Sequence, residues 1–113
     1  MYSVPGAVTM GTAGNDIICG TEGDDRIAGL GGDDIVYGFG GNDQLSGGDG
    51  ADRMFGGLGN DSFIGGAGAD FTSGGPGADR FSADGTDRID VGAGPGDLCV
   101  INGAAVACPP RLS

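Results

Sequence analysis

The chain has 113 residues, which is enough for one small domain but too few for a deep globular core. Glycine supplies 28 of them, so folding costs much conformational entropy and requires a stabilising contribution beyond a hydrophobic core. A formal net charge of -11, with no histidine, argues against nucleic acid and anionic membrane surfaces as partners.

Residues 1–10, MYSVPGAVTM, form a lead-in segment before the regular part of the sequence. The segment has no basic start and no sustained apolar run, so we identify no classical signal peptide. No stretch of the sequence is long and apolar enough to predict a membrane span.

Residues 11–82 consist of eight consecutive nine-residue units without insertion or deletion. The first and fourth positions are always glycine, and the sixth is always aspartate: Asp16, Asp25, Asp34, Asp43, Asp52, Asp61, Asp70 and Asp79. The eighth position holds Ile18, Ile27, Val36, Leu45, Met54, Phe63, Thr72 and Phe81, of which only Thr72 is not a large apolar residue. Disordered acidic segments lack such a fixed spacing, so the repeat predicts an ordered structure.

A nine-residue period does not fit an α-helix, where each glycine would cost about 1 kcal/mol. Glycines at positions one and four permit a six-residue loop with left-handed backbone angles, and the other three residues suffice for a short strand. We therefore predict an all-β fold, a parallel β-roll. This is a two-sheet β-solenoid with 18 residues per turn, in which position eight packs between the sheets.

Stacked turns would place the aspartates of alternate units above one another in two columns, about 4.8 Å apart along each column. Carboxylates at that spacing repel by about 1 kcal/mol per neighbour even in water, so we predict a cation between stacked loops. The alternative is that the aspartates cap turns without a metal.

The ligands on offer are carboxylate and backbone carbonyl oxygens, which favour Ca²⁺ over zinc or copper. Mg²⁺ requires a tighter octahedral shell and fits less well. An EF-hand is excluded because its loop needs a glutamate at position twelve, whereas the only glutamate of this chain is Glu22.

The unit resembles the calcium-binding nonapeptide GGxGxDxUx of the repeats-in-toxin (RTX) family, which forms parallel β-rolls. The resemblance covers residues 11–82. It implies that one loop contributes the carbonyls of positions two and four and its aspartate. The loop one turn later contributes the carbonyls of positions one and three and its aspartate.

The resemblance thus implies six calcium sites, three in each column. In the first column they are Thr12, Gly14 and Asp16 with Gly29, Gly31 and Asp34; Leu30, Gly32 and Asp34 with Gly47, Asp49 and Asp52; and Gly48, Gly50 and Asp52 with Gly65, Ala67 and Asp70. In the second they are Thr21, Gly23 and Asp25 with Gly38, Gly40 and Asp43; Phe39, Gly41 and Asp43 with Gly56, Leu58 and Asp61; and Gly57, Gly59 and Asp61 with Gly74, Pro76 and Asp79. Position two departs from glycine in the first four units, but only its carbonyl is needed. Six Ca²⁺ ions would nearly neutralise the net charge of -11.

The repeat degenerates over residues 83–113. Gly85 and Asp87 keep a G-x-D pattern one place out of register, and the original frame returns at Gly92 and Asp97. A seventh site would involve Gly75, Gly77 and Asp79 with the loop that carries Asp97, where Pro95 replaces the fourth glycine.

The tail LCVINGAAVAC predicts a β-hairpin around Asn102-Gly103 that caps the last coil. A four-residue NGAA loop would set Cys99 opposite Cys108 and allow a disulfide, whereas a tight two-residue turn would set Cys99 opposite Val106. We predict the disulfide, which suits an extracytoplasmic protein and leaves Cys19 unpaired.

The two outer faces of the predicted roll differ. The odd units place mainly apolar residues outside, among them Ile17, Ile35, Tyr37, Phe55 and Phe71, whereas the outward residues of the even units are mostly polar. A large apolar face is usually covered. We expect the chain's own ends, or a like partner, to cover this one.

We find no catalytic constellation, since the sequence has neither histidine nor lysine and its strand serines have no base, so we predict no enzyme. The predicted function is a calcium-binding β-roll module that folds on binding Ca²⁺. The resemblance implies a folding, secretion or spacer role in an exported bacterial protein, and a secreted or cell-surface location. The alternative is a calcium-scaffolded interaction module that uses the apolar outer sheet to bind a partner or a second copy of the chain.

Overall fold

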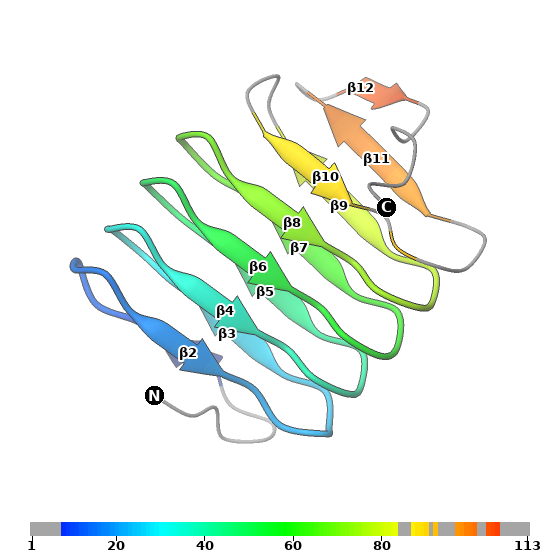
Figure 1. The fold of residues 1–113 in the computed structure, drawn as a ribbon, viewed down its shortest axis with the longest axis horizontal. Coiled ribbons are helices and arrows are strands. Elements are labelled where there is room, and N and C mark those ends of the chain that lie inside the picture. Colours follow the sequence, from blue (N-terminus) through cyan, green and yellow to red (C-terminus); the bar gives the residue numbers. More distant parts are fainter. Residues whose placement is uncertain (1–7, 84–86, 91, 93–96, 102–103, 107–113) are drawn as a thin grey trace.

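The structure, a computed structural model, describes residues 8–83, 87–90, 92, 97–101 and 104–106. Within these residues it consists of short strands joined by loops, with no helix (Figure 1). The strands are β1 (Val8–Met10), β2 (Ile17–Cys19), β3 (Arg26–Ala28), β4 (Ile35–Tyr37), β5 (Gln44–Ser46), β6 (Arg53–Phe55), β7 (Ser62–Ile64), β8 (Phe71–Ser73), β9 (Arg80–Ala83), β10 (Arg88–Asp90), β11 (Leu98–Ile101) and β12 (Ala104–Val106).

Strands β1 to β11 alternate between two sheets, which confirms the predicted β-roll. One sheet has the order β10-β8-β6-β4-β2, and the other has the order β1-β3-β5-β7-β9-β11-β12. Figure 1 shows the two sheets as layers, with loops that turn back at both edges of the stack.

Strands in the repeat region pair in parallel and in the predicted register of 18 residues. Ile17 pairs with Ile35, which pairs with Arg53, which pairs with Phe71. The position-one glycines extend each ladder by one hydrogen bond, as when the N–H of Gly29 donates to the carbonyl of Ser46 at 2.8 Å. Each three-residue strand therefore continues into its loop without losing its backbone partner.

The space between the sheets is filled by the eighth position of each unit, as predicted. The buried apolar residues are Ile18, Ile27, Val36, Leu45, Met54, Phe63 and Phe81, continued beyond the repeats by Ile89 and Cys99. Thr72 occupies the same row and is also buried, and its hydroxyl has no hydrogen-bond partner among the described residues. This core is one side chain wide, so little apolar area is buried per turn.

Part of the lead-in segment belongs to the roll. β1 pairs in parallel with β3, with Thr9 opposite Ile27, and forms the first edge of the seven-stranded sheet. This strand was not expected from the sequence, because the segment before Gly11 carries none of the repeat's glycine and aspartate pattern.

The C-terminal hairpin caps the same sheet. β11 pairs in parallel with β9, and β12 pairs in antiparallel fashion with β11. Ile101 pairs with Ala104 and Cys99 with Val106, so the predicted four-residue loop is wrong and the alternative with two residues between the strands holds. An Asn-Gly pair favours this tight turn because both residues accept positive φ.

Cys99 is nevertheless disulfide-bonded. Its predicted partner, Cys108, lies outside the described residues. Cys19 is a free cysteine at the end of β2, as predicted.

The outer face of the five-stranded sheet carries exposed apolar and aromatic side chains, and Ile17 is 59% exposed. Of the chain ends predicted to cover this face, the N-terminal YSVPGAV lies outside the described residues except for Val8, which begins β1 of the other sheet, and the hairpin extends that other sheet too. The described residues also contain no helix with the length and apolar character needed to span a membrane.

Candidate functional site

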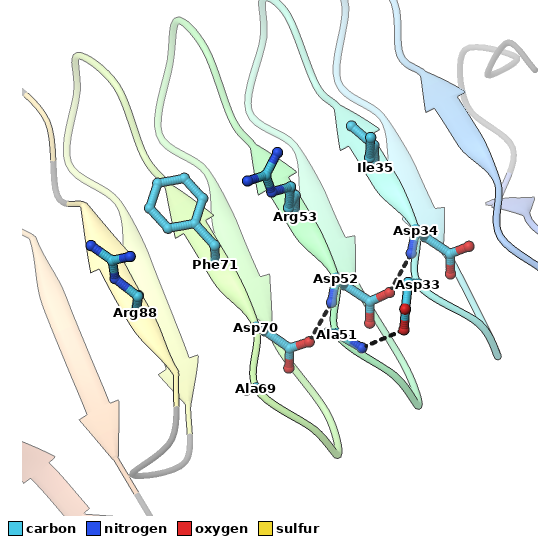
Figure 2. Close-up of a pocket in the computed structure, with 10 residues that line it drawn as sticks. All are labelled: Asp33, Asp34, Ile35, Ala51, Asp52, Arg53, Ala69, Asp70, Phe71 and Arg88. Carbon is cyan, nitrogen blue, oxygen red and sulfur yellow. Dashed lines mark hydrogen bonds between the residues drawn. The ribbon is translucent and has the colours of Figure 1, made fainter.

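The repeat aspartates form the two columns predicted from their spacing, and backbone hydrogen bonds fix their orientation. The N–H of each aspartate donates to Oδ1 of the aspartate one turn later, as from Asp34 to Asp52 and from Asp52 to Asp70, both at 2.8 Å (Figure 2). The same bond joins the pairs Asp16–Asp34, Asp25–Asp43, Asp43–Asp61 and Asp61–Asp79 at 2.8 to 2.9 Å. One oxygen of each accepting carboxylate is thereby satisfied inside the protein.

The other carboxylate oxygen has no such partner in the interior of the columns. The Oδ2 atoms of Asp34, Asp43, Asp52, Asp61 and Asp79 are buried without a hydrogen bond among the described residues. Their side chains are at most 1% exposed, so water does not supply the missing partner over an open surface. A buried carboxylate oxygen without a donor is costly, and a cation is the usual compensation.

Backbone carbonyls of the next turn lie near the Oδ2 atoms of Asp34, Asp43 and Asp52. A methyl group placed on Gly47 would lie 2.5 Å from Oδ2 of Asp52 and 2.8 Å from the carbonyl oxygen of Gly65. The same pair of oxygens surrounds the first glycine of the four preceding units, Gly11, Gly20, Gly29 and Gly38. The aspartate of one loop and the position-one carbonyl of the loop above it therefore face the same small space.

The carbonyls of positions two and four also point toward the following turn. A methyl group on Gly48 would contact the carbonyl oxygen of Leu30, and one on Gly50 would contact that of Gly32. From the third unit onward both positions are left-handed, with φ of 71° at Leu30 and 83° at Gly32. Left-handed backbone costs a residue with a side chain about 1–2 kcal/mol, which Leu30 and Phe39 accept at position two.

The residues predicted to supply position-three carbonyls lie farther out in the loops than the other predicted ligands. Asp49, Leu58, Ala67 and Pro76 are exposed at the loop tips. Gly31 and Gly40 lie against the position-three backbone of the preceding turn. Their contribution of carbonyl oxygens stays a prediction.

The donor set fits a hard divalent cation. Each gap offers two carboxylates and several carbonyl oxygens, which is the oxygen-only set that Ca²⁺ accepts in flexible geometry. Within the described residues no cluster of three or more His, Cys, Asp or Glu side chains is arranged to hold a metal ion without backbone ligands. Side-chain clusters alone would not reveal such a site, because most of its ligands are backbone atoms.

Burial disfavours the charged form of these carboxyl groups in the absence of a cation. It raises the pKa of Asp43 and Asp79 to about 7 and that of Asp52 and Asp61 to about 6, although the backbone hydrogen bond to each lowers it in part. Burial also raises the pKa of Asp34. The columns thus carry carboxylates that the protein alone does not stabilise.

Two further aspartates extend the columns beyond the repeats. The N–H of Asp79 donates to Oδ1 of Asp97 at 2.7 Å, so Asp97 continues the second column by one turn; the seventh site stays a prediction. The N–H of Asp70 donates to Oδ1 of Asp87 at 2.8 Å, over 17 residues instead of 18. A methyl group on Gly65 would lie 2.7 Å from Oδ2 of Asp70 and 3.0 Å from Oδ2 of Asp87.

Asp87 was not among the predicted site residues, although the G-x-D pattern of Gly85 and Asp87, followed by the apolar Ile89, was the signal in the sequence. Arg88 pairs with Phe71 and Ile89 with Thr72, so the strand register is restored one residue early and the deletion falls in the preceding loop.

The family model described as RTX calcium-binding nonapeptide repeat (4 copies) matches the chain over residues 10–45, 20–54 and 46–81. No curated protein sequence and no solved structure gives a significant match to the chain.

Proposed function

Because the chain belongs to the RTX calcium-binding nonapeptide repeat family, we propose that it is a module whose folding depends on calcium bound between its stacked loops. The observation that carries this proposal is the row of buried Oδ2 atoms that have no hydrogen-bond donor among the described residues; at Asp34, Asp43 and Asp52 a carbonyl oxygen of the next turn borders the same space. A core one side chain wide contributes too little to fold a glycine-rich chain by itself.

The gaps between successive aspartates of each column are the proposed calcium positions. Six gaps lie within residues 11–82, and the pairs Asp79–Asp97 and Asp70–Asp87 add one at the end of each column. Bound Ca²⁺ would supply positive charge to paired carboxylates and a partner for the loop carbonyls. In each interior aspartate of the columns, a backbone N–H would orient Oδ1, and Oδ2 would stay buried between the stacked loops to bind the ion.

The test is far-UV circular dichroism of metal-stripped protein titrated with CaCl₂, with MgCl₂ as the control. We expect a cooperative gain of β signal with calcium alone, since a site that forms only on folding couples binding to folding. A chain that is already folded in chelator, and indifferent to calcium, would show that the aspartate columns have another role.

The wider role we propose is a folding, secretion or spacer module of an exported bacterial protein, located outside the cell and without catalytic activity of its own. RTX repeats typically occur in exported proteins. The proposed boundaries are a lead-in at 1–10, whose last three residues pair with the roll as β1, the repeat region of the β-roll at 11–82, and a degenerate repeat with the capping hairpin at 83–113. Extracellular calcium modules bind at about 10⁻⁴–10⁻³ M, so the module should be unfolded at micromolar calcium and folded at millimolar calcium.

A second candidate function is an interaction module, and the aromatic outer face supports it. Tyr37 and Phe55 stack with ring centroids 5.2 Å apart, and Phe71 meets Phe55 edge-on at 5.9 Å. A calcium-dependent dimer in size-exclusion chromatography with light scattering would favour this function. A calcium-loaded monomer would favour the simple module.

A further inference from the structure

The loops of the roll have two backbone conformations. From loop 29–34 onward, positions two and four are both left-handed: φ is 71° and 83° in that loop, and 80° and 98° at Gly57 and Gly59. In the first two loops, 11–16 and 20–25, none of Thr12, Gly14, Thr21 and Gly23 has a positive φ. The division follows position two, which is threonine in these two loops and leucine, phenylalanine or glycine in the others.

A threonine resists the left-handed region because its branched Cβ crowds the backbone there. The alternative conformation in loop 11–16 turns the amide of Thr12 toward Asp16, where it donates to Oδ2 at 2.6 Å. The Thr12 hydroxyl oxygen lies 3.1 Å from Oδ1 and 3.0 Å from Oδ2 of Asp16, and it accepts from the N–H of Gly14 at 3.1 Å.

Loop 20–25 repeats this arrangement. The N–H of Thr21 donates to Oδ2 of Asp25 at 2.7 Å, and its hydroxyl lies 3.0 Å from Oδ1 and 3.3 Å from Oδ2. The N–H of Gly23 donates to the hydroxyl oxygen at 3.1 Å. Asp25 is only 1% exposed, as buried as the aspartates of the later loops.

The first two aspartates therefore receive donors on the oxygen that the interior aspartates leave without any. Asp34 and Asp43, one turn later, have buried Oδ2 atoms with no hydrogen bond from the described residues. The carbonyls of Gly29 and Gly38 approach the first two aspartates as in other units, so the difference lies in the threonine and in the backbone of positions two and four.

We propose that Thr12 and Thr21 take the place of calcium in the first turn of the roll, so that the gaps following loops 11–16 and 20–25 bind no ion. This inference rests on the proposed function and limits it, because two of the six gaps within the repeats then stay empty. The N-terminal end of the stack is closed by side-chain donors, and Asp16 and Asp25 still position the next turn through their N–H bonds to Asp34 and Asp43. The residue at position two of a loop decides whether the gap above it binds calcium.

The test counts bound Ca²⁺ per folded chain, by equilibrium dialysis and metal analysis with excess calcium. In the double variant T12G/T21G the hydroxyls are absent and left-handed loops are allowed, so we expect two more ions than in the parent chain. The conservative variant T12S/T21S restores the hydroxyl and should return the count to the parental value.

The reciprocal variant L30T/F39T places threonine at position two of the next two loops. Leu30 and Phe39 are 43% and 46% exposed, so the exchange does not disturb the core. We expect the count to fall by two, which keeps the test decisive if T12G/T21G fails to fold.

An unchanged count in T12G/T21G and in L30T/F39T, with calcium still bound by the parent, would overturn this inference and leave the proposed function standing. Binding of calcium by none of the chains would overturn both.

Discussion

The backbone N–H of Asp52 donates a 2.8 Å hydrogen bond to Oδ1 of Asp70, while Oδ2 of Asp52 is buried without a hydrogen-bond donor in the described structure. The N–H of Asp34 in turn donates to Oδ1 of Asp52, so the backbone fixes where the Asp52 carboxylate points but supplies a donor to only one of its two oxygens. Because this relationship repeats along both columns, the hydrogen bonds fix the register of the stacked turns, but buried carboxylate oxygens remain without a compensating donor or cation.

Asp52→Asn should weaken calcium binding by at least tenfold. The substitution keeps an oxygen that can accept the N–H of Asp34, but it removes one of the charges shared by two adjacent gaps. A unit charge pair at about 4 Å is worth about 1 kcal/mol even in water, and a divalent ion doubles this value. Isothermal titration calorimetry with CaCl₂ measures the change.

The matched control is Asp33→Asn, which removes the same charge from an exposed neighbour. Oδ1 of Asp33 accepts the N–H of Ala51 at 2.8 Å, a bond that asparagine can keep. Equal losses of affinity in the two variants would mean that net charge, and not the column, governs binding.

Acidification should stabilise the metal-free chain. The ordinary pKa of these carboxyl groups is 3.8, and burial raises it in the fold to about 7 at Asp43 and Asp79 and to about 6 at Asp52 and Asp61. Groups with a raised folded-state pKa stabilise the fold below pH 4, and this stabilisation is lost as the pH rises through 6 to 7.

Circular dichroism of metal-stripped protein should therefore show more β signal at pH 4.5 than at pH 7.5. Protons and calcium compete for the same oxygens, so the apparent calcium affinity should rise between pH 5.5 and 7.5. A β signal that decreases on acidification would contradict the assignment of these groups as buried and unpaired.

The β-roll and its core could be predicted from the sequence because the nine-residue unit repeats without insertion or deletion over residues 11–82. Position eight, from Ile18 to Phe81, has the same surroundings in every turn, so a single pattern predicts the whole row. Asp87 breaks the count by one residue, and a fixed period cannot show that the loop before it absorbs the deletion.

The threonine loops were beyond sequence reasoning for a different reason. The pattern indicated that position two serves only through its carbonyl, whereas the structure brings the hydroxyls of Thr12 and Thr21 to Asp16 and Asp25. That contact requires a backbone conformation without the left-handed residues of the later loops, and the spacing of the glycines is the same in both kinds of loop. The hairpin was likewise decided by turn geometry, since Ile101 and Ala104 pair across two residues.

Glycine at position four should be replaceable in the first loops and required in the later ones. Gly14 is not left-handed, and an added methyl group would meet only the Thr12 hydroxyl oxygen at 3.7 Å, so Gly14→Ala should stabilise by about 0.4–1 kcal/mol. Gly50 has φ of 106° and faces the carbonyl of Gly32, so Gly50→Ala should cost more than about 2 kcal/mol.

Urea denaturation at saturating calcium compares the two alanine variants with the parent. Loss of stability in Gly14→Ala as large as in Gly50→Ala would show that the first loops share the backbone of the later ones in solution.

Thr72→Val should stabilise the calcium-loaded roll by about 1–2 kcal/mol. Thr72 is 3% exposed between Met54 and Ile89 of the neighbouring strands, and its buried hydroxyl has no hydrogen-bond partner among the described residues. Valine has nearly the same shape, and it removes a buried polar group that costs about 1–3 kcal/mol when unsatisfied. Thr72→Ser keeps the hydroxyl and deletes the methyl group, so its urea midpoint should fall while that of Thr72→Val rises. A lower midpoint for Thr72→Val would mean that the hydroxyl is satisfied in solution and that the core at this turn needs a polar group.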